Sequence, residues 1–310
     1  MKVSPNIICI ASVVFFSLAR SGYGQKTHSG EKQEGAIIAA GIKPVLIDSR
    51  FSFTEGPAVD KQGNVFFTDQ PNNRIWEYDI NGKLKLFLDS AGRSNGMYFD
   101  SKGNLITCAD EKDQLWSIDK NKKIRILLKD YRGHRLNGPN DLWISPSGDI
   151  YLTDPYFQRD YWTRKMADPA LGGEKLYCLR HNQKELILVE SETVKPNGLV
   201  GAPDGKWLYV ADMGLGKTFR YGINPDGTLK NKQLFVNQAS DGMTIDNRGN
   251  IYLTGDGVSV YNPAGKKIAQ IDIPEKWTAN ICFYGKEKNI LFITASKSIY
   301  LLPTRVKGVE

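Results

Sequence analysis

The chain has 310 residues, a formal net charge of +7 and an ordinary apolar content for a globular protein. Basic runs interleaved with aromatic residues do not occur, so the composition argues against nucleic-acid binding. The sequence also lacks the glycine fingerprints of P-loop and dinucleotide-binding folds, the Gly-x-Ser-x-Gly of α/β-hydrolases and the Cys-x-x-Cys of redox sites.

The first 24 residues have the features of a secretory signal peptide. Lys2 supplies the positive end, residues 7–18 form an apolar run, and Gly22-Tyr-Gly24 offers small residues for cleavage. A run of this length is too short to span a bilayer comfortably. We therefore expect an exported protein, periplasmic or secreted, with no membrane span after cleavage and a flexible polar lead-in over residues 25–41.

An internal repeat organises residues 42–306, which we expect to form one domain. In each unit a polar residue stands eight positions before a turn glycine, and in the last unit the offset is kept although lysine replaces the glycine. The pairs are Glu55 and Gly63, Asn95 and Gly103, Asn140 and Gly148, Asn197 and Gly205, Asp241 and Gly249, and Asn280 and Lys288. The spacing of about 40–57 residues between units is typical of propeller blades.

Each unit contains four short runs rich in β-branched and aromatic residues, separated by turn residues. In the first unit these runs are 55–60, 64–69, 74–78 and 83–87, and in the second they are 95–100, 105–109, 114–118 and 124–128. The pattern predicts an all-β fold, a six-bladed β-propeller of four-stranded blades. Residues 43–48 have the phase of a fourth strand, so we expect this N-terminal strand to complete the last blade and close the ring.

The six polar residues that begin the units are expected to meet at one mouth of the central channel, because each begins an innermost strand. They supply only oxygen ligands, which suits Ca²⁺ best, with Mg²⁺, Mn²⁺ or Zn²⁺ as alternatives. For any single Asn-Gly pair, a role in turn formation is the more common explanation. Glutamate is a poor turn former, however, so Glu55 favours a metal site.

Two further features lie near the same mouth. Aspartates end the second runs of four units, at Asp69, Asp110, Asp154 and Asp212. Capping of turns is their commoner role, but Asp154 and Asp212 are also candidates for supporting the metal ligands or contacting substrate at the mouth. The long insertion 155–173, which carries Tyr156, Phe157, Tyr161, Trp162 and Arg164, is predicted to form a lid or wall over the mouth, the alternative being a loop that shields a sheet edge.

These motifs, in this order, resemble the SMP-30/gluconolactonase family of six-bladed propellers. The segments that carry the resemblance are Thr54-Glu-Gly-Pro57, Arg135-Leu-Asn-Gly-Pro-Asn-Asp141, Tyr151-Leu-Thr-Asp-Pro-Tyr156, Lys195-Pro-Asn-Gly198 and Ser240-Asp-Gly-Met243. The resemblance implies metal-dependent hydrolysis of sugar lactones and related esters. It also implies that Glu55, Asn197 and Asp241 are metal ligands, that Asn140 binds metal or substrate, and that Arg135 contacts substrate.

We therefore expect a monomeric, gluconolactonase-like carboxylic-ester hydrolase that opens a small sugar lactone by metal-polarised attack of water. Asp241 and Asp154 are the candidate catalytic carboxylates. The predicted substrate-binding residues are Asn140, Arg135, Tyr156 and Trp162. Two alternatives remain open: a non-catalytic propeller that binds a glycan or protein around a structural ion, and an organophosphate-type ester hydrolase.

Overall fold

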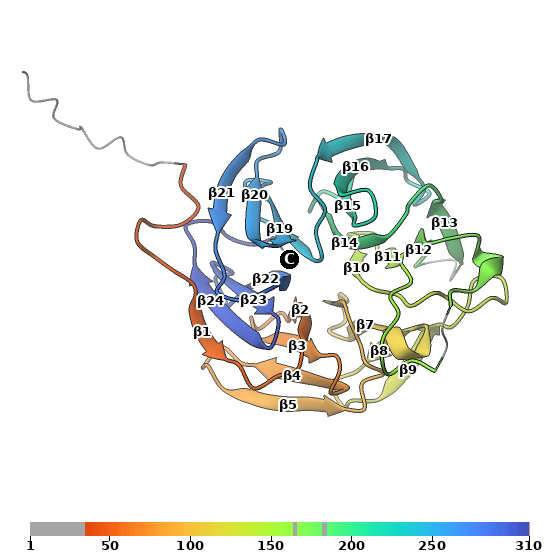
Figure 1. Ribbon diagram of the computed structural model, residues 1–310, viewed down its shortest axis with the longest axis horizontal. Helices are drawn as coiled ribbons and strands as arrows, with labels where there is room; N and C mark the ends of the chain where they lie inside the picture. Colours follow the sequence, from red (N-terminus) through yellow and green to blue (C-terminus); the bar gives the residue numbers. More distant parts are fainter. Residues whose placement is uncertain (1–34, 164–165, 182–184, 310) are drawn as a thin grey trace, which may run out of the picture. The chain divides into compact units, whose positions relative to one another are not determined.

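Six four-stranded antiparallel sheets surround a central axis, as Figure 1 shows for the computed structural model. The structure describes residues 35–163, 166–181 and 185–309, so the predicted signal peptide lies outside the described residues. Within these ranges no helix has the length and apolarity needed to cross a membrane. The predicted six-bladed β-propeller is confirmed.

Each blade consists of four strands that follow one another from the axis outward. In the first three blades they are β2 Thr54–Val59, β3 Val65–Asp69, β4 Arg74–Tyr78 and β5 Leu84–Asp89; β6 Met97–Phe99, β7 Leu105–Ala109, β8 Gln114–Ile118 and β9 Ile124–Leu128; and β10 Leu142–Ile144, β11 Ile150–Asp154, β12 Lys175–Leu179 and β13 Leu186–Glu190. In the last three they are β14 Pro196–Gly201, β15 Trp207–Asp212, β16 Lys217–Ile223 and β17 Leu229–Val236; β18 Met243–Ile245, β19 Ile251–Gly255, β20 Gly257–Tyr261 and β21 Lys267–Ile271; and β22 Thr278–Tyr284, β23 Ile290–Ala295, β24 Ser298–Pro303 and β1 Val45–Asp48.

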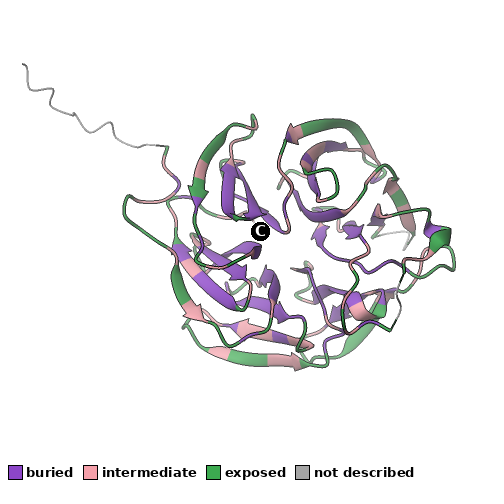
Figure 2. Cartoon of the chain, viewed as in Figure 1, coloured by how far each residue is buried: buried purple, intermediate pink, exposed green. Residues whose placement is uncertain are grey.

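Burial falls from the axis to the rim of the ring, as Figure 2 shows. Every residue of β2 and β3 is buried, whereas β5 has only intermediate and exposed residues. Apolar side chains fill the space between neighbouring blades. Between the first two blades, for example, the ring of Phe66 meets those of Phe87 and Phe99 edge-on at centroid distances of 4.9 and 5.2 Å. A buried aromatic side chain such as Phe66 contributes about 1.5–3 kcal/mol, so packing between the blades stabilises the ring.

The N-terminal strand closes the ring as predicted. Strand β1 pairs antiparallel with β24, and Val45 lies opposite Leu301. The packed chain extends beyond the predicted limits of 42 and 306. Ile37 is buried, and its carbonyl accepts a hydrogen bond from the backbone of Arg305 at 2.8 Å. Near the other end, Gly308 forms a bridge with Asp246.

The turn that follows each innermost strand explains the repeated glycine. The marker glycines adopt left-handed backbone angles, for example φ of 92° at Gly63 and 77° at Gly249. Lys288, which replaces the glycine in the last unit, is held at φ of 50°. This conformation costs a residue with a Cβ about 1–2 kcal/mol.

Lys288→Gly is therefore expected to stabilise the protein by about 0.5 kcal/mol, because relief of strain exceeds the entropy cost of glycine in the unfolded chain. Urea unfolding measures the effect. Lys286→Gly, two residues earlier at an exposed position without positive φ, is the matched control and should destabilise. If Lys288→Gly lowered the free energy of unfolding, the backbone of Lys288 would not be under the strain that we infer.

Candidate metal and active site

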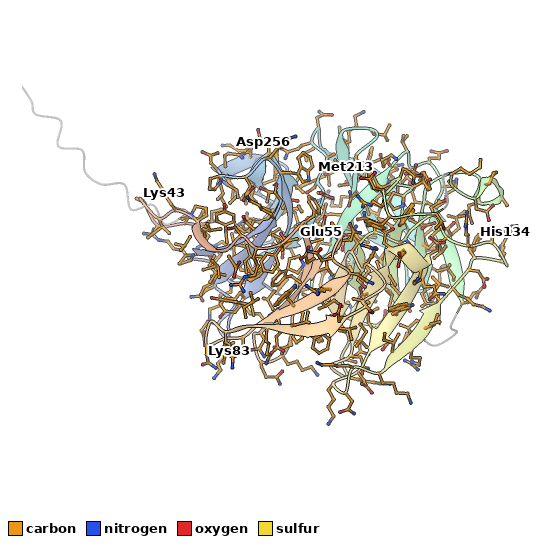
Figure 3. The ribbon with its side chains drawn as sticks, turned by 60° about the horizontal axis from the view of Figure 1, so that its bottom comes forward. Lys43, Glu55, Lys83, His134, Met213 and Asp256 are labelled. Atoms are coloured by element: carbon orange, nitrogen blue, oxygen red, sulfur yellow. The ribbon has the colours of Figure 1, made fainter. Side chains whose placement is uncertain are left out.

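The six polar residues that mark the repeat converge around the axis. Five are buried, namely Glu55, Asn95, Asn140, Asn197 and Asn280, while Asp241 is partly exposed. Figure 3 places Glu55 in the interior of the ring. Hydrogen bonds join neighbouring blades, because the Asn280 Nδ2 donates to Glu55 Oε2 at 3.3 Å and the Asn197 Nδ2 donates to Asp241 Oδ1 at 2.8 Å. The structure therefore joins four of the six side chains, in two pairs from adjacent blades.

Close packing around the axis requires the glycines that follow four of these residues. A Cβ on Gly56, Gly96, Gly198 or Gly242 would lie 2.0–2.5 Å from atoms of the next blade. At Gly242 the obstructing group is the side-chain amide of Asn280, and at Gly198 it is the carbonyl of Asp241. These glycines therefore let each innermost strand approach the polar residue of its neighbour, a role that turn formation alone does not explain.

Gly242→Ala is expected to destabilise the protein by about 1–3 kcal/mol, because the new methyl group must displace the Asn280 amide in a closely packed channel. Chemical denaturation measures the change in the free energy of unfolding. A variant as stable as the wild type would show that the inner strands have room to separate.

The electrostatics of the site favour a bound cation. Burial raises the pKa of Glu55 well above its usual value, and the nearby carboxylates of Asp241 and Asp141 raise it further. Burial also raises the pKa of Asp241, against the lowering effect of hydrogen bonds from Trp277 and Asn197. A cation held between these carboxylates would reverse the unfavourable ionisation.

The donor atoms fit a hard divalent ion. The Asn197 Oδ1 is buried and has no hydrogen-bond partner within the described part of the chain, although its Nδ2 is bonded to Asp241. A buried amide oxygen of this kind costs free energy unless a ligand satisfies it. The described residues contain no group of three or more His, Cys, Asp or Glu side chains placed to hold a metal. A site here therefore depends on asparagine oxygens together with Glu55 and Asp241, an all-oxygen set that suits Ca²⁺.

Sequence reasoning missed Trp277, which lies just before β22. Its indole Nε1 donates to Asp241 Oδ2 at 2.6 Å, so the two oxygens of this carboxylate are bonded by Trp277 and Asn197. The pair is 36 residues apart in sequence. The only signal was a tryptophan close to the marker residue Asn280. Trp277 fixes the rotamer of Asp241 at the mouth.

Trp277→Phe is expected to lower kcat for hydrolysis by about 10-fold while leaving the fold intact, because it removes one charge-assisted hydrogen bond worth about 1.5–3 kcal/mol. Steady-state kinetics against a lactone, with a thermal melt as the control for folding, measure this. Unchanged kcat would mean that Asn197 alone holds the carboxylate.

Three of the four aspartates at the ends of the second strands act as caps, whereas Asp110 accepts a hydrogen bond from the Gln70 side chain. The Asp154 Oδ2 and Oδ1 accept hydrogen bonds from the backbone N–H groups of Asn137 and Gly138, both at 2.9 Å. In the first and fourth blades, Asp69 and Asp212 likewise accept hydrogen bonds from backbone N–H groups. Since Asp154 is fully buried, the geometry favours its capping role. Its role as a catalytic carboxylate stays a prediction without support from this arrangement.

The insertion after β11 lies against the second blade. The Arg93 guanidinium stacks over the Tyr161 ring at 4.1 Å, and the Arg159 Nε lies 3.6 Å from Asp110 Oδ2. Within the insertion, Tyr156 and Trp162 pack together with ring centroids 5.5 Å apart. The described part of the loop therefore forms a wall beside the mouth. Arg164 lies outside the described residues.

The predicted substrate contacts differ from one another in how far solvent reaches them. Trp162 is buried, so only its partner Tyr156, of intermediate exposure, offers ring surface. Arg135 is exposed, and among the described residues no hydrogen bond or ion pair joins it to the polar ring. Its neighbour His134 lies at the periphery in Figure 3 and pairs with Asp168 at 3.7 Å. Contact between Arg135 and substrate stays a prediction.

The fold and the site together define a six-bladed propeller with an oxygen-rich polar ring at the mouth of its channel. Residues 53–297 match the model of the SMP-30/Gluconolactonase/LRE-like region, and the chain belongs to this family. The resemblance inferred from the sequence is thereby confirmed.

One curated gluconolactonase and several solved structures are similar to this chain over most of their length. A gluconolactonase from Zymomonas mobilis is 27% identical over 304 residues, which cover 88% of this chain and 84% of the relative. The solved structure of a gluconolactonase from Xanthomonas campestris has a TM-score of 0.79 at 27% identity and covers 87% of this chain and 91% of its own. The structure of regucalcin from Agrobacterium tumefaciens shares the fold, with a TM-score of 0.72 at 18% identity over 86% of this chain and 95% of its own. The relatives support a lactone hydrolase.

Proposed function

We propose that the protein is a metal-dependent lactonase that hydrolyses a sugar lactone, and that Ca²⁺ is its ion. The observation that carries the proposal is the pairing of Asn197 with Asp241, whose charge raises the pKa of nearby Glu55, together with an Asn197 oxygen that is buried and has no hydrogen-bond partner among the described residues. The similarity to gluconolactonases over most of the chain supports the substrate class. Asn140, buried at the same mouth, would orient ion or substrate.

In this proposal Glu55, Asn197 and Asp241 hold the ion by their oxygens. A cation held there would supply Lewis-acid chemistry, polarising the lactone carbonyl and stabilising the negative charge that develops on its oxygen. The partly exposed Asp241 carboxylate accepts a proton from the attacking water. The bond between the carbonyl carbon and the ring oxygen then breaks, and the ring oxygen leaves as a hydroxyl after taking up that proton.

Asp241 is suited to this role by its fixed position more than by its basicity. Trp277 and Asn197 hold one oxygen each, and both hydrogen bonds lower the pKa of the carboxylate. A carboxylate next to a cation is a weak base, so most of the rate enhancement would come from positioning and charge stabilisation. Tyr156 on the wall offers a ring face for the sugar.

The experiment is hydrolysis of glucono-1,5-lactone by the purified protein after treatment with EDTA and after addition of Ca²⁺, Mg²⁺, Mn²⁺ or Zn²⁺ in turn. The proposal predicts that EDTA abolishes hydrolysis without unfolding and that Ca²⁺ restores it. Full activity after EDTA would refute metal dependence. A folded protein that opens no lactone but cleaves a phosphotriester would support the organophosphate alternative, and one inactive on both would support the binding module.

A further inference from the structure

Two cationic side chains converge on one aromatic ring beside the mouth. The Arg159 Cζ lies 5.2 Å from the centroid of the Phe157 ring, and the Lys195 Nζ lies 4.7 Å from the same centroid. Phe157 and Arg159 belong to the wall, whereas Lys195 immediately precedes β14 and stands two residues before Asn197. Segments from two blades thus bring positive charge to the entrance of the proposed site.

Arg159 lies against the second blade. Its Nε lies 3.6 Å from Asp110, which follows β7 in the second blade. Asp110 follows the second strand of its blade, at the same end of the blade as the marker residue Asn95, so the guanidinium lies beside the mouth.

The hydrogen-bonding capacity of Arg159 is unused. A guanidinium has five N–H donors, yet across the described ranges none of them makes a hydrogen bond, and the Nε is buried. The separation from Asp110 exceeds hydrogen-bonding distance, and Asp110 Oδ2 already accepts from Gln70 Nε2 at 2.9 Å. The side chain of Arg159 is 26% exposed, so a ligand at the mouth can reach it.

Lys195, the second cation at the Phe157 ring, is held in place by two polar contacts. Its Nζ donates to the carbonyl of Tyr156 at 2.8 Å and pairs with Glu174 at 3.3 Å. These contacts fix the ammonium group against the wall. The Arg159 guanidinium, which keeps its N–H donors free of hydrogen bonds among the described residues, is suited to a carboxylate, phosphate or sulfonate, because arginine supplies planar, bidentate hydrogen bonding, and Lys195 adds a second positive charge at the same ring.

We propose that Arg159, with Lys195 beside it, binds an anionic substituent of the substrate, so that lactones with a phosphate, carboxylate or sulfonate group are preferred to neutral ones. This specificity rests on the proposed lactonase function. The anion lies over the wall and the lactone carbonyl lies over the polar ring. Arg159 then determines which lactone is bound and leaves the chemical step to the residues around Asp241.

The test compares 6-phosphoglucono-1,5-lactone with glucono-1,5-lactone in wild type and Arg159→Gln. Loss of charge-assisted hydrogen bonds worth about 1.5–3 kcal/mol should raise KM for the phosphorylated lactone by about 10–100-fold, while KM for the neutral lactone changes by less than about 3-fold. The control is Arg93→Gln, because Arg93 also anchors the wall, through Tyr161. It should affect both lactones equally. If Arg159→Gln changed KM equally for both lactones, Arg159 would only anchor the wall, and the proposal would be wrong.

Calorimetry measures binding without hydrolysis, so it tests the anion site independently of the proposed lactonase function. Wild type should bind 6-phosphogluconate at least about 10-fold more tightly than gluconate, and Arg159→Gln should abolish the difference. If wild type hydrolyses neither lactone, the proposed function fails, and the binding data still decide whether Arg159 recognises the anion. Equal binding of both acids by wild type would refute the anion site even if lactones are hydrolysed.

Discussion

Replacing Asp241 by alanine is expected to lower kcat/KM for lactone hydrolysis by about 1,000-fold or more. Asp241 is the one carboxylate of the ring that is partly exposed at the mouth, and it serves in the proposal both as a ligand and as the proton acceptor. Loss of a group that stabilises charge at a reacting centre typically costs about 100–1,000-fold in kcat, and loss of a metal ligand adds to this. Initial rates with the Ca²⁺-loaded protein measure the effect.

Asp241→Asn is the matched control for shape. It keeps the size of the side chain but removes the charge, and its amide N–H₂ group must face the donor of either Trp277 or Asn197. We expect a loss of activity nearly as large as that of the alanine variant. Activity within about 3-fold of wild type in both variants would remove Asp241 from the mechanism.

Removal of the ion is expected to lower the melting temperature by about 5–10 °C. A ligand at 100 times its dissociation constant stabilises a folded protein by about 2.7 kcal/mol, and each kcal/mol shifts the midpoint by about 2–4 °C for a chain of this size. Thermal melts in EDTA and in excess Ca²⁺ measure the shift. Identical melts would show that no Ca²⁺ binds.

Glu55→Gln is the control that links this stability to the site. Because burial and neighbouring carboxylates raise the pKa of Glu55 in the folded protein, its ionisation costs stability as pH rises above the unfolded value of about 4.5. In EDTA, wild type should therefore lose stability relative to Glu55→Gln between pH 5 and pH 8. In Ca²⁺ the order should reverse at pH 8, since the variant lacks a ligand. If the stability of both proteins depended on pH in the same way, the pKa of Glu55 would not be raised in the folded protein.

The blade architecture could be predicted from the sequence because strands and turns leave local patterns of apolar and turn residues. Alternating apolar residues and turn residues predicted strands such as β7 and β8 to the residue, at 105–109 and 114–118. The fixed offset between marker and turn predicted a common mouth. The closing strand β1 followed from its phase in the repeat, even though its partner β24 lies more than 200 residues away.

Other features depend on contacts between distant segments, which the sequence does not display. The hydrogen bond from Trp277 to Asp241 and the ion pair of Arg159 with Asp110 of the second blade depend on how loops cross the mouth. The glycines after the marker residues looked like turn formers, whereas Gly242 is needed because the Asn280 side chain lies against it. The sequence left Asp154 as a candidate catalytic carboxylate, but both of its oxygens accept hydrogen bonds from the backbone N–H groups of Asn137 and Gly138.

A crystal structure of the protein soaked in Ca²⁺ or Mn²⁺, with anomalous data, would show whether the polar ring binds a cation. We predict one peak on the axis, about 2.2–2.6 Å from oxygens of Glu55, Asn197 and Asp241. An ion bound elsewhere, or an empty ring in crystals of a protein that is active with that ion, would contradict the proposed site.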